Sequence, residues 1–179
     1  MGRRHVNTLC AWLLWILCSC ASNGAVLEPF PEKAKPVVRC GYAERVAEPL
    51  ARKYRVEYAL VMGVMRVESL FHPRVRSHAG AIGMMQVMPG TGKHYQCGNL
   101  YDPVENIECG VRILRSLLRR YKGNEIYALG AYNGGSGYIR RSHKGGRVPP
   151  NLGYAELVLK SRNRYLKGGC QKLVRPIGR

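Results

Sequence analysis

The feature that most restricts the fold of this chain is the spacing of its apolar residues, which recur every three or four positions from Cys40 onward. Side chains at that spacing share one face of an α-helix, and no stretch of useful length shows the alternation typical of a β-strand. The pattern therefore predicts a mainly α fold. We expect helices over residues 42–54, 57–69, 103–121, 124–133 and 154–166.

Proline, glycine and capping residues indicate where these helices begin and end. Pro49, inside the first helix, predicts a kink or a boundary. Asp102 precedes a proline and stands three positions before Glu105, which is typical of a helix start with aspartate as the N-cap. Residues 70–90 contain proline and spaced glycines and should form a loop with short turns, and the glycine-rich, basic residues 134–150 should form another.

Glu68 is the acidic residue with the most unusual surroundings. It follows Val64 by four residues and Val61 by seven, so a helix brings it onto the apolar face, and no Asp or Glu occurs from Ser69 to Tyr101. An apolar setting penalises the charged form of a carboxyl group, so we expect the pKa of Glu68 to be raised. A carboxyl group that stays protonated near neutral pH can act as a general acid.

The N-terminal residues have the composition of an export signal. A basic start at Arg3 and Arg4 precedes an apolar run over residues 9–18, and small residues follow. The run is too short for a permanent membrane-spanning helix. We expect a signal peptide over residues 1–21, and the alternative is a lipoprotein signal that leaves Cys20 lipidated.

The remainder of the chain has the size of one domain. A length of 179 residues is sufficient for one hydrophobic core and too short for two domains of ordinary size. Residues 22–39 contain several prolines and no sustained periodicity, which predicts a linker. The domain is therefore expected to cover residues 40–179.

Removal of a leader leaves Cys40, Cys97, Cys109 and Cys170 in the folded part of the chain. In an oxidising compartment they suggest two disulfides, although four cysteines allow three pairings that the sequence does not distinguish. We favour Cys97 with Cys109, a short link between a loop and a helix, and Cys40 with Cys170, which joins the ends of the domain. Unpaired thiols are the alternative. Spacings typical of zinc ligands are absent from the sequence, so we expect no metal.

The chain is strongly basic, with a formal net charge of +18, or 18 − 2 = +16 once Arg3 and Arg4 are removed with the leader. Such an excess favours a polyanionic partner, which could be nucleic acid, an anionic membrane surface or an acidic cell-wall polymer. The export signal argues against nucleic acid as the partner. Contact with a membrane is expected only if Cys20 carries a lipid anchor.

Four blocks of sequence occur in one order along the chain: Glu68-Ser69, the stretch GAIGMMQVMP at 80–89, the stretch AYNGG at 131–135, and Tyr154. With these blocks the chain resembles the catalytic domain of the soluble lytic transglycosylases, bacterial enzymes that cut the glycan strands of peptidoglycan. The resemblance extends over residues 54–165. It implies a lysozyme-like single domain of the goose-type and transglycosylase kind, with a substrate cleft.

The resemblance also implies a reaction. Glu68 would protonate the glycosidic oxygen between N-acetylmuramic acid and N-acetylglucosamine and then take the proton of the C6 hydroxyl, which closes a 1,6-anhydro ring. One acid is sufficient because the substrate supplies the nucleophile, whereas ordinary glycosidases use two carboxylates. No cofactor is implied. The residues expected to bind the substrate are Ser77, Gln86, Met88, Tyr132, Asn133 and Tyr154.

Alternative functions depend on features that the sequence leaves open. If Glu108, Glu125 or Glu156 lay opposite Glu68, the chain would be a lysozyme-type hydrolase with two acids. A wall-binding module without catalysis is a further alternative, and Glu68 argues against it. The segment before Tyr154 is shorter than is usual in the family. We expect an exported, periplasmic enzyme or an outer-membrane lipoprotein that acts on peptidoglycan glycan strands, with assistance to an envelope-spanning secretion or appendage system as one use.

Overall fold

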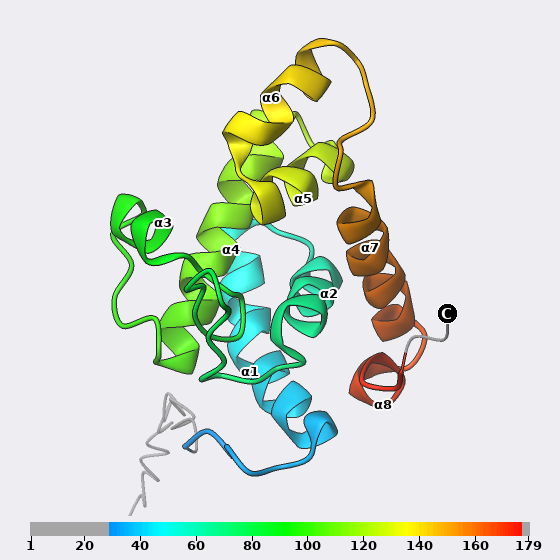
Figure 1. The fold of residues 1–179 in the computed structure, drawn as a ribbon. Helices are drawn as coiled ribbons and strands as arrows, with labels where there is room; N and C mark the ends of the chain where they lie inside the picture. The colour runs from blue at the N-terminus through cyan, green and yellow to red at the C-terminus, as the bar shows by residue number, and fades with distance from the viewer. Residues whose placement is uncertain (1–28, 177–179) are drawn as a thin grey trace, which may run out of the picture.

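The computed structural model describes residues 29–176 of the chain. These residues form helices joined by turns and loops, and their extended pairing is confined to isolated bridges that join Ile82 to Arg76 and to Val87. The mainly α prediction is confirmed. The helices (Figure 1) are α1 Pro36–Tyr54, α2 Tyr58–Ser69, α3 Pro89–His94, α4 Pro103–Arg120, α5 Glu125–Gly134, α6 Ser136–Lys144, α7 Leu152–Leu166 and α8 Gly169–Leu173.

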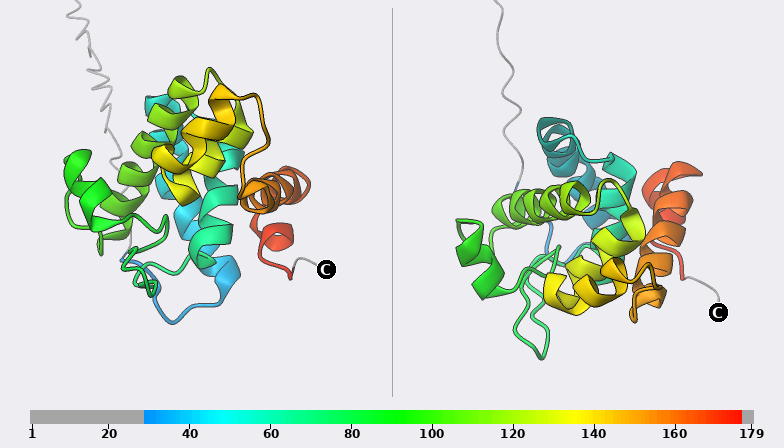
Figure 2. Two further views of the ribbon diagram at one scale, coloured as in Figure 1. Left: turned by 45° about the horizontal axis from the view of Figure 1, so that its top comes forward. Right: turned by 90° about the horizontal axis from the view of Figure 1, so that it is seen from above.

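Helix α2 forms the centre of the domain. Every residue from Ala59 to Met65 is buried, and Figures 1 and 2 show the helix between α1 on one side and α7 on the other. Gly63 permits a close approach to α7, because a Cβ atom there would lie 2.8 Å from the backbone oxygen of Val158. Full burial of a Val, Leu or Met side chain stabilises a fold by roughly 1.5–3 kcal/mol. The helix that carries Glu68 is therefore a rigid part of the core.

The predicted linker is partly helical and partly packed on the domain. Helix α1 begins at Pro36, so the last four residues of the expected linker, 36–39, are helical, and that part of the prediction was wrong. Proline suits the first position of a helix because the N–H it lacks would have no partner there. Before the helix, the ring of Phe30 packs edge-on against Tyr42, with centroids 4.9 Å apart, and Glu32 pairs with Arg74 at 2.6 Å.

Helices α3, α6 and α8 lie in segments for which the sequence analysis predicts a loop or no secondary structure at all. They are short, and α6 buries little apart from Ile139 and Ser142, so they lack the repeated apolar positions from which a helix is recognised. Pro49 lies inside α1, which continues to Tyr54. Of the two outcomes expected at Pro49, a kink or a helix boundary, the boundary is therefore excluded.

Two disulfides join the pairs that the sequence analysis favours. Cys40 of α1 is bonded to Cys170 of α8, and Cys97, in the loop after α3, is bonded to Cys109 of α4. The first disulfide joins the two ends of the domain, and the second attaches a loop to a helix. The expected signal peptide and Cys20 lie outside the described residues. Within residues 29–176, no helix is long and apolar enough to cross a bilayer.

Candidate active site

Glu68 lies in the last turn of α2, where the chain leaves the core. The helix ends because Leu70 and Phe71 adopt left-handed conformations, with φ of 51° and 61°. Such angles are uncommon for residues with a side chain. The Phe71 side chain is fully buried, and that burial offsets the strain. The end of the helix, and with it the position of Glu68, is therefore fixed by the core.

The Glu68 carboxyl group experiences two opposing effects on its pKa. Burial raises the pKa above its usual range because the charged form is poorly solvated, and a hydrogen bond from Tyr154 partly opposes the rise. The Tyr154 hydroxyl donates to Glu68 Oε1 at 2.5 Å. Tyr154 is at the start of α7, far from Glu68 in sequence. The raised pKa expected from the apolar face of α2 thus agrees with the structure.

Tyr132 of α5 is the second tyrosine near this carboxyl group. Burial raises the pKa of both Tyr132 and Tyr154 well above the usual value, and the charge of Glu68 raises both further, which places both rings within electrostatic range of it. Both hydroxyls therefore stay neutral and act as donors. The Tyr132 hydroxyl donates to the Met85 carbonyl at 2.8 Å. Its ring packs against the core, as its partial burial requires.

The loop between α2 and α3 is attached to the end of α2 beside Glu68. Ser69 Oγ donates to the Met84 carbonyl at 2.8 Å. Within the loop, Ser77 Oγ accepts from the Ala81 amide at 3.0 Å. Gln86 Nε2 donates to the carbonyls of Val75 and Gly83. Ser77 and Gln86, both expected to bind substrate, thus also maintain the shape of this loop.

Met88 and Asn133 differ from the other expected substrate residues in being exposed. The Met88 side chain is 42% exposed at the end of the loop. Asn133, at the end of α5, accepts a hydrogen bond from Asn151 Nδ2 at 3.0 Å, and the same nitrogen donates to the Gly130 carbonyl. The start of α7, which carries Tyr154, is thereby attached to the end of α5.

Asn106 is a residue that the sequence analysis missed. It is fully buried on α4, its Oδ1 accepts from the Met85 amide, and its Nδ2 donates to the carbonyls of Ile82 and Leu100, each at 2.9 Å. Gly83 faces it so closely that a Cβ atom there would meet the amide at 2.4 Å. Asn106 therefore holds the loop whose carbonyls bind Ser69 and Tyr132. The available signal was a polar residue on the apolar face of α4.

The other acids among residues 29–176 are engaged elsewhere or exposed. Glu108 pairs with Lys53 at 2.7 Å, Glu125 pairs with Arg162 at 2.8 Å, and Glu156 is exposed on α7. Further acids of the described chain bind arginine, a tyrosine hydroxyl or a backbone amide, and these are Glu32, Glu44, Glu48, Glu57, Asp102 and Glu105. Nor do three or more potential metal ligands gather anywhere in this part of the chain.

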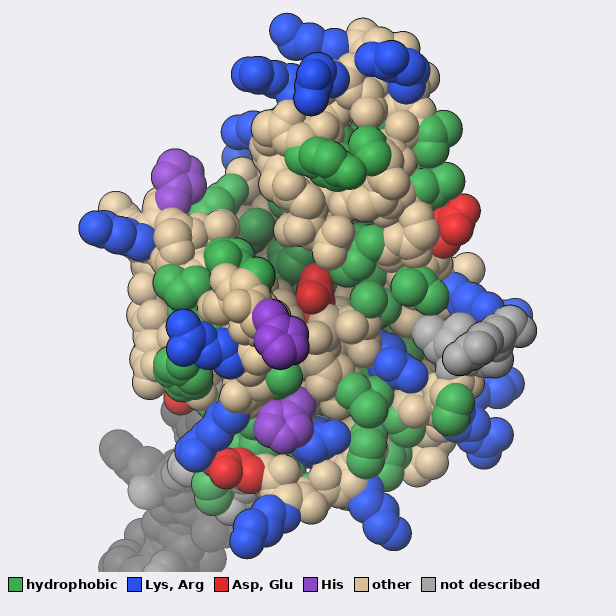
Figure 3. Space-filling view, viewed as in Figure 1, with side chains coloured by type: hydrophobic (Ala, Val, Ile, Leu, Met, Phe, Trp, Pro, Cys, Tyr) green, Lys and Arg blue, Asp and Glu red, His purple; other side chains and the backbone are tan. Residues whose placement is uncertain are grey.

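Charged side chains are unevenly distributed over the face of the molecule that Figure 3 shows. Figure 3 shows one acidic side chain near the middle of the face, in a hollow bordered by hydrophobic side chains. Lys and Arg side chains gather at the top of this face, over α6 and the segment after it, and along its lower edge. A ligand in the hollow would therefore meet the acid bordered by apolar surface, with the basic side chains farther out at the top and lower edge of this face.

This helical domain carries a half-buried carboxyl group of raised pKa at the end of its central helix, and its fold matches solved lytic transglycosylases, which places it in the lysozyme-like class. Residues 46–147 match the family described as "Transglycosylase SLT domain", and this chain belongs to that family.

Known proteins of this kind are similar over part of their length. The chain is 45% identical over 84 residues to the transglycosylase of Enterobacteria phage PRD1, across 47% of this chain and 31% of the phage protein. It is 36% identical over 95 residues to the soluble lytic murein transglycosylase of Escherichia coli, across 48% of this chain and 15% of that protein. The structure of the 70-kDa soluble lytic transglycosylase of E. coli matches with a TM-score of 0.57 and 29% identity, across 70% of this chain and 25% of that one. The chain thus spans less than a third of the length of each.

Proposed function

We propose that this chain is an exported lytic transglycosylase that cleaves peptidoglycan between N-acetylmuramic acid and N-acetylglucosamine and leaves 1,6-anhydro ends. The observation that carries the proposal is the Glu68 carboxyl group, whose pKa is raised by burial and which accepts a hydrogen bond from Tyr154 at 2.5 Å. Membership of the transglycosylase family supports the same conclusion.

In the first step Glu68 acts as the general acid. Because burial raises its pKa, a larger fraction of the carboxyl group is protonated near neutral pH than in an exposed glutamate. The proton passes to the glycosidic oxygen, the bond from that oxygen to C1 of the muramic acid breaks, and positive charge develops at C1. The N-acetyl oxygen of the substrate can stabilise that charge, as in the substrate-assisted glycosidases.

In the second step Glu68 acts as the base. The carboxylate takes the proton of the C6 hydroxyl, the C6 oxygen bonds to C1, and the carboxyl group returns to its starting state without the consumption of water. The Tyr154 hydroxyl favours the charged form by donating to it, so it limits how far burial raises the pKa. A group that must first give and then take a proton works best with a pKa near the working pH.

The positions of the other acids support a reaction with one carboxyl group rather than two. Glu108 and Glu125 are paired with basic residues on other helices, and Glu156 is exposed. A hydrolase of the lysozyme type would need a second carboxylate across the scissile bond.

The remaining expected site residues have proposed roles in binding the sugar. Gln86 and Asn133 offer amide groups that can pair with acetamido and hydroxyl groups, and Ser77 offers a hydroxyl. Met88 presents exposed apolar surface, and the buried Tyr132 lies within electrostatic range of Glu68.

The proposal is tested by mass spectrometry of muropeptides released from purified sacculi. The expected products carry 1,6-anhydro-muramic acid, and Glu68→Gln should release fewer than about 1% as many because general acid catalysis contributes 10²- to 10⁴-fold. Glu156→Gln removes an exposed acid on α7 and should leave the release unchanged. Products with reducing muramic acid ends would instead assign the chain to the lysozyme-type hydrolases.

Export is the second part of the proposal. We infer a signal peptide over residues 1–21, with lipidation at Cys20 as the variant, and a catalytic domain over residues 40–179 whose first helix begins slightly earlier, at Pro36. The basic, apolar and small residues of the leader support it. Intact mass of the chain from fractionated cells distinguishes cleavage after Ala21 from cleavage before a lipidated Cys20, and an uncleaved chain in the cytoplasm would contradict export. Assistance to an envelope-spanning machine is supported only by the small size of the domain.

A further inference from the structure

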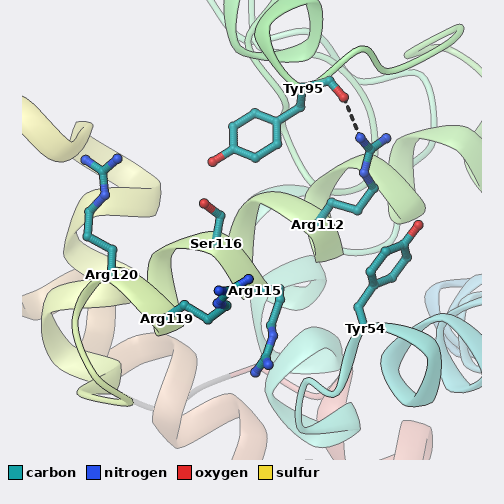
Figure 4. A pocket seen from close by; sticks show the side chains of 7 residues that line it. All are labelled: Tyr54, Tyr95, Arg112, Arg115, Ser116, Arg119 and Arg120. Atoms are coloured by element: carbon teal, nitrogen blue, oxygen red, sulfur yellow. Dashed lines mark hydrogen bonds between the residues drawn. The ribbon is translucent and has the colours of Figure 1, made fainter.

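A second concave surface lies along α4, separate from Glu68. It is an open hollow of about 620 Å³ and is lined by Tyr54, Tyr95, Arg112, Arg115, Ser116, Arg119 and Arg120. Figure 4 shows these side chains: the Tyr95 ring lies over α4, the Ser116 hydroxyl points toward that ring, Arg112 reaches up to Tyr95, and Arg115 points to the opposite side of the helix. We call this surface the arginine pocket.

The arginine pocket shares no lining residue with the candidate active site. It is formed by α4, by Tyr54 at the end of α1 and by Tyr95 at the end of α3, whereas Glu68 and its tyrosines are on α2, α5 and α7. A ligand could therefore occupy it without contact with Glu68.

Two of the arginines are held in place by uncharged groups. Arg112 donates to the Tyr95 carbonyl at 2.7 Å, and Arg115 donates to the Arg55 carbonyl at 3.3 Å. Both side chains are half-buried. Because a guanidinium group has five N–H donors, each keeps donors for a ligand. Fixed donors lose less conformational entropy on binding than mobile ones.

The positive charge of the arginine pocket is only weakly compensated. Glu108 is the nearest acid on α4, but it is engaged by Lys53 and Tyr54, and Arg112 is the weakest of the influences that lower its pKa. Among the described residues, Arg119 and Arg120 form no ion pair and are exposed.

Stabilisation of α4 accounts for only part of this arrangement. The helix dipole favours cations in the last turn, which explains Arg119 and Arg120. Arg112 and Arg115 lie one to two turns earlier, and like charges three or four positions apart on a helix repel. A concave surface that gathers charges of one sign focuses the field on an ion of the opposite sign.

We propose that the arginine pocket binds a phosphate ester with at least two negative charges. Guanidinium groups match the oxygens of phosphate in paired hydrogen bonds, and the hydroxyls of Ser116 and Tyr95 are further donors. A phosphate monoester carries roughly 1.5–2 negative charges at pH 7, so it compensates up to two arginines, whereas one carboxylate compensates one. The source of this ligand is a soluble phosphorylated compound or the headgroup of an anionic lipid.

The test measures the binding of inorganic pyrophosphate to the full chain by isothermal titration calorimetry. We expect saturable binding that Arg115→Gln with Arg119→Gln weakens at least tenfold. The matched control, Arg140→Gln with Arg141→Gln, removes the same charge from exposed positions on α6 and should leave the affinity within twofold. Thermal unfolding of each variant establishes that it is folded. Glu68→Gln should bind as the wild type does, so the outcome is independent of the proposed catalysis.

Further probes separate the chemistry and the source of the ligand. Arg119→Lys keeps the positive charge but loses the planar guanidinium group with its paired N–H donors. This variant should bind pyrophosphate less tightly than the wild type. Citrate, a tricarboxylate of similar charge, should bind at least tenfold more weakly than pyrophosphate. Vesicles of phosphatidylcholine with phosphatidic acid test the lipid source, which is assigned if their binding also requires Arg115 and Arg119. Absence of saturable pyrophosphate binding, equal loss in the α6 control, or equal affinity for citrate would each overturn the proposal.

Discussion

At the scale of single residues, the candidate site depends on the balance between burial of Glu68 and the hydrogen bond from Tyr154. Burial raises the pKa of the carboxyl group, and the hydroxyl opposes the rise. Tyr154→Phe keeps the ring and removes the donor, so the pKa of Glu68 should rise further. Activity requires the protonated acid and falls as the pH rises through this pKa. The alkaline limb of the pH–activity profile should therefore move to higher pH, at a reduced maximal rate.

The control for this prediction is Tyr132→Phe. The Tyr132 hydroxyl donates to the Met85 carbonyl rather than to Glu68, so its removal should lower activity without the same upward movement of the alkaline limb. Kinetics of sacculus clearance across a pH series provide both profiles. An alkaline limb that stays in place, or moves to lower pH, in Tyr154→Phe would show that the hydrogen bond does not set the pKa of Glu68.

Glu68 should lower the stability of the fold at neutral pH, although activity requires it. A carboxyl group whose pKa is raised by folding ionises more readily in the unfolded chain, so it destabilises the fold as the pH rises above its unfolded pKa of about 4.3. Glu68→Gln removes this cost and should raise the free energy of unfolding by roughly 0.5–2 kcal/mol at neutral pH. The gain should vanish at about pH 3 and below, where the carboxyl group is protonated in both states. Urea unfolding at several pH values measures it, and a gain independent of pH would contradict the explanation.

At the scale of secondary-structure elements, α4 determines the shape of the loop that borders Glu68. The buried Asn106 amide bonds three backbone groups of the chain between α2 and α4. Asn106→Ala leaves those groups without their partner, and each buried unsatisfied group costs about 1–3 kcal/mol. We expect a loss of about 3 kcal/mol in urea unfolding, with a fall in activity. Asn99→Ala removes an exposed asparagine that accepts from the Tyr101 amide and should cost less than about 0.5 kcal/mol.

The sequence predicts elements well where one face is repeatedly apolar. Helices α2 and α4 follow from that spacing and, for α4, from the Asp102 cap, which the structure confirms with a hydrogen bond from the Glu105 amide at 2.9 Å. Helix α6 was missed because its few buried positions give no such pattern. The Glu68 setting follows from spacing within α2, whereas its contact with Tyr154 joins residues 86 positions apart, which only the family resemblance indicated.

Asn106 illustrates a limit of sequence reasoning at this scale. Its position on an apolar helix face indicates burial, but the backbone groups that it binds are determined by the loop that packs there. Gly83 and Gly110 belong to the same contact, because Cβ atoms at these positions would meet the Asn106 amide at 2.4 Å and Met85 Sδ at 2.3 Å. Close packing of a loop on a helix therefore explains these glycines, which the sequence alone assigns only to turns or helix interiors.

At the scale of the whole molecule, the two disulfides constrain very different lengths of chain. Cys40 and Cys170 are 130 residues apart and join α1 to α8, whereas Cys97 and Cys109 are 12 residues apart. A disulfide stabilises a fold mainly by lowering the entropy of the unfolded chain, and this effect increases with the length of the closed loop. The loop-entropy relation gives about 5 kcal/mol for the long loop and about 3 kcal/mol for the short one at 25 °C.

Removal of each disulfide by paired serine substitution tests this difference. Cys40→Ser with Cys170→Ser should lower the free energy of unfolding by about 2 kcal/mol more than Cys97→Ser with Cys109→Ser, as measured by urea unfolding at neutral pH. The short disulfide lies beside the arginine pocket and the long one joins the termini of the domain, so neither variant removes a contact of Glu68. Both variants should therefore retain cleavage at temperatures where they remain folded. A larger loss from the short disulfide would mean that local packing of the loop on α4, rather than chain entropy, determines the stability that it provides.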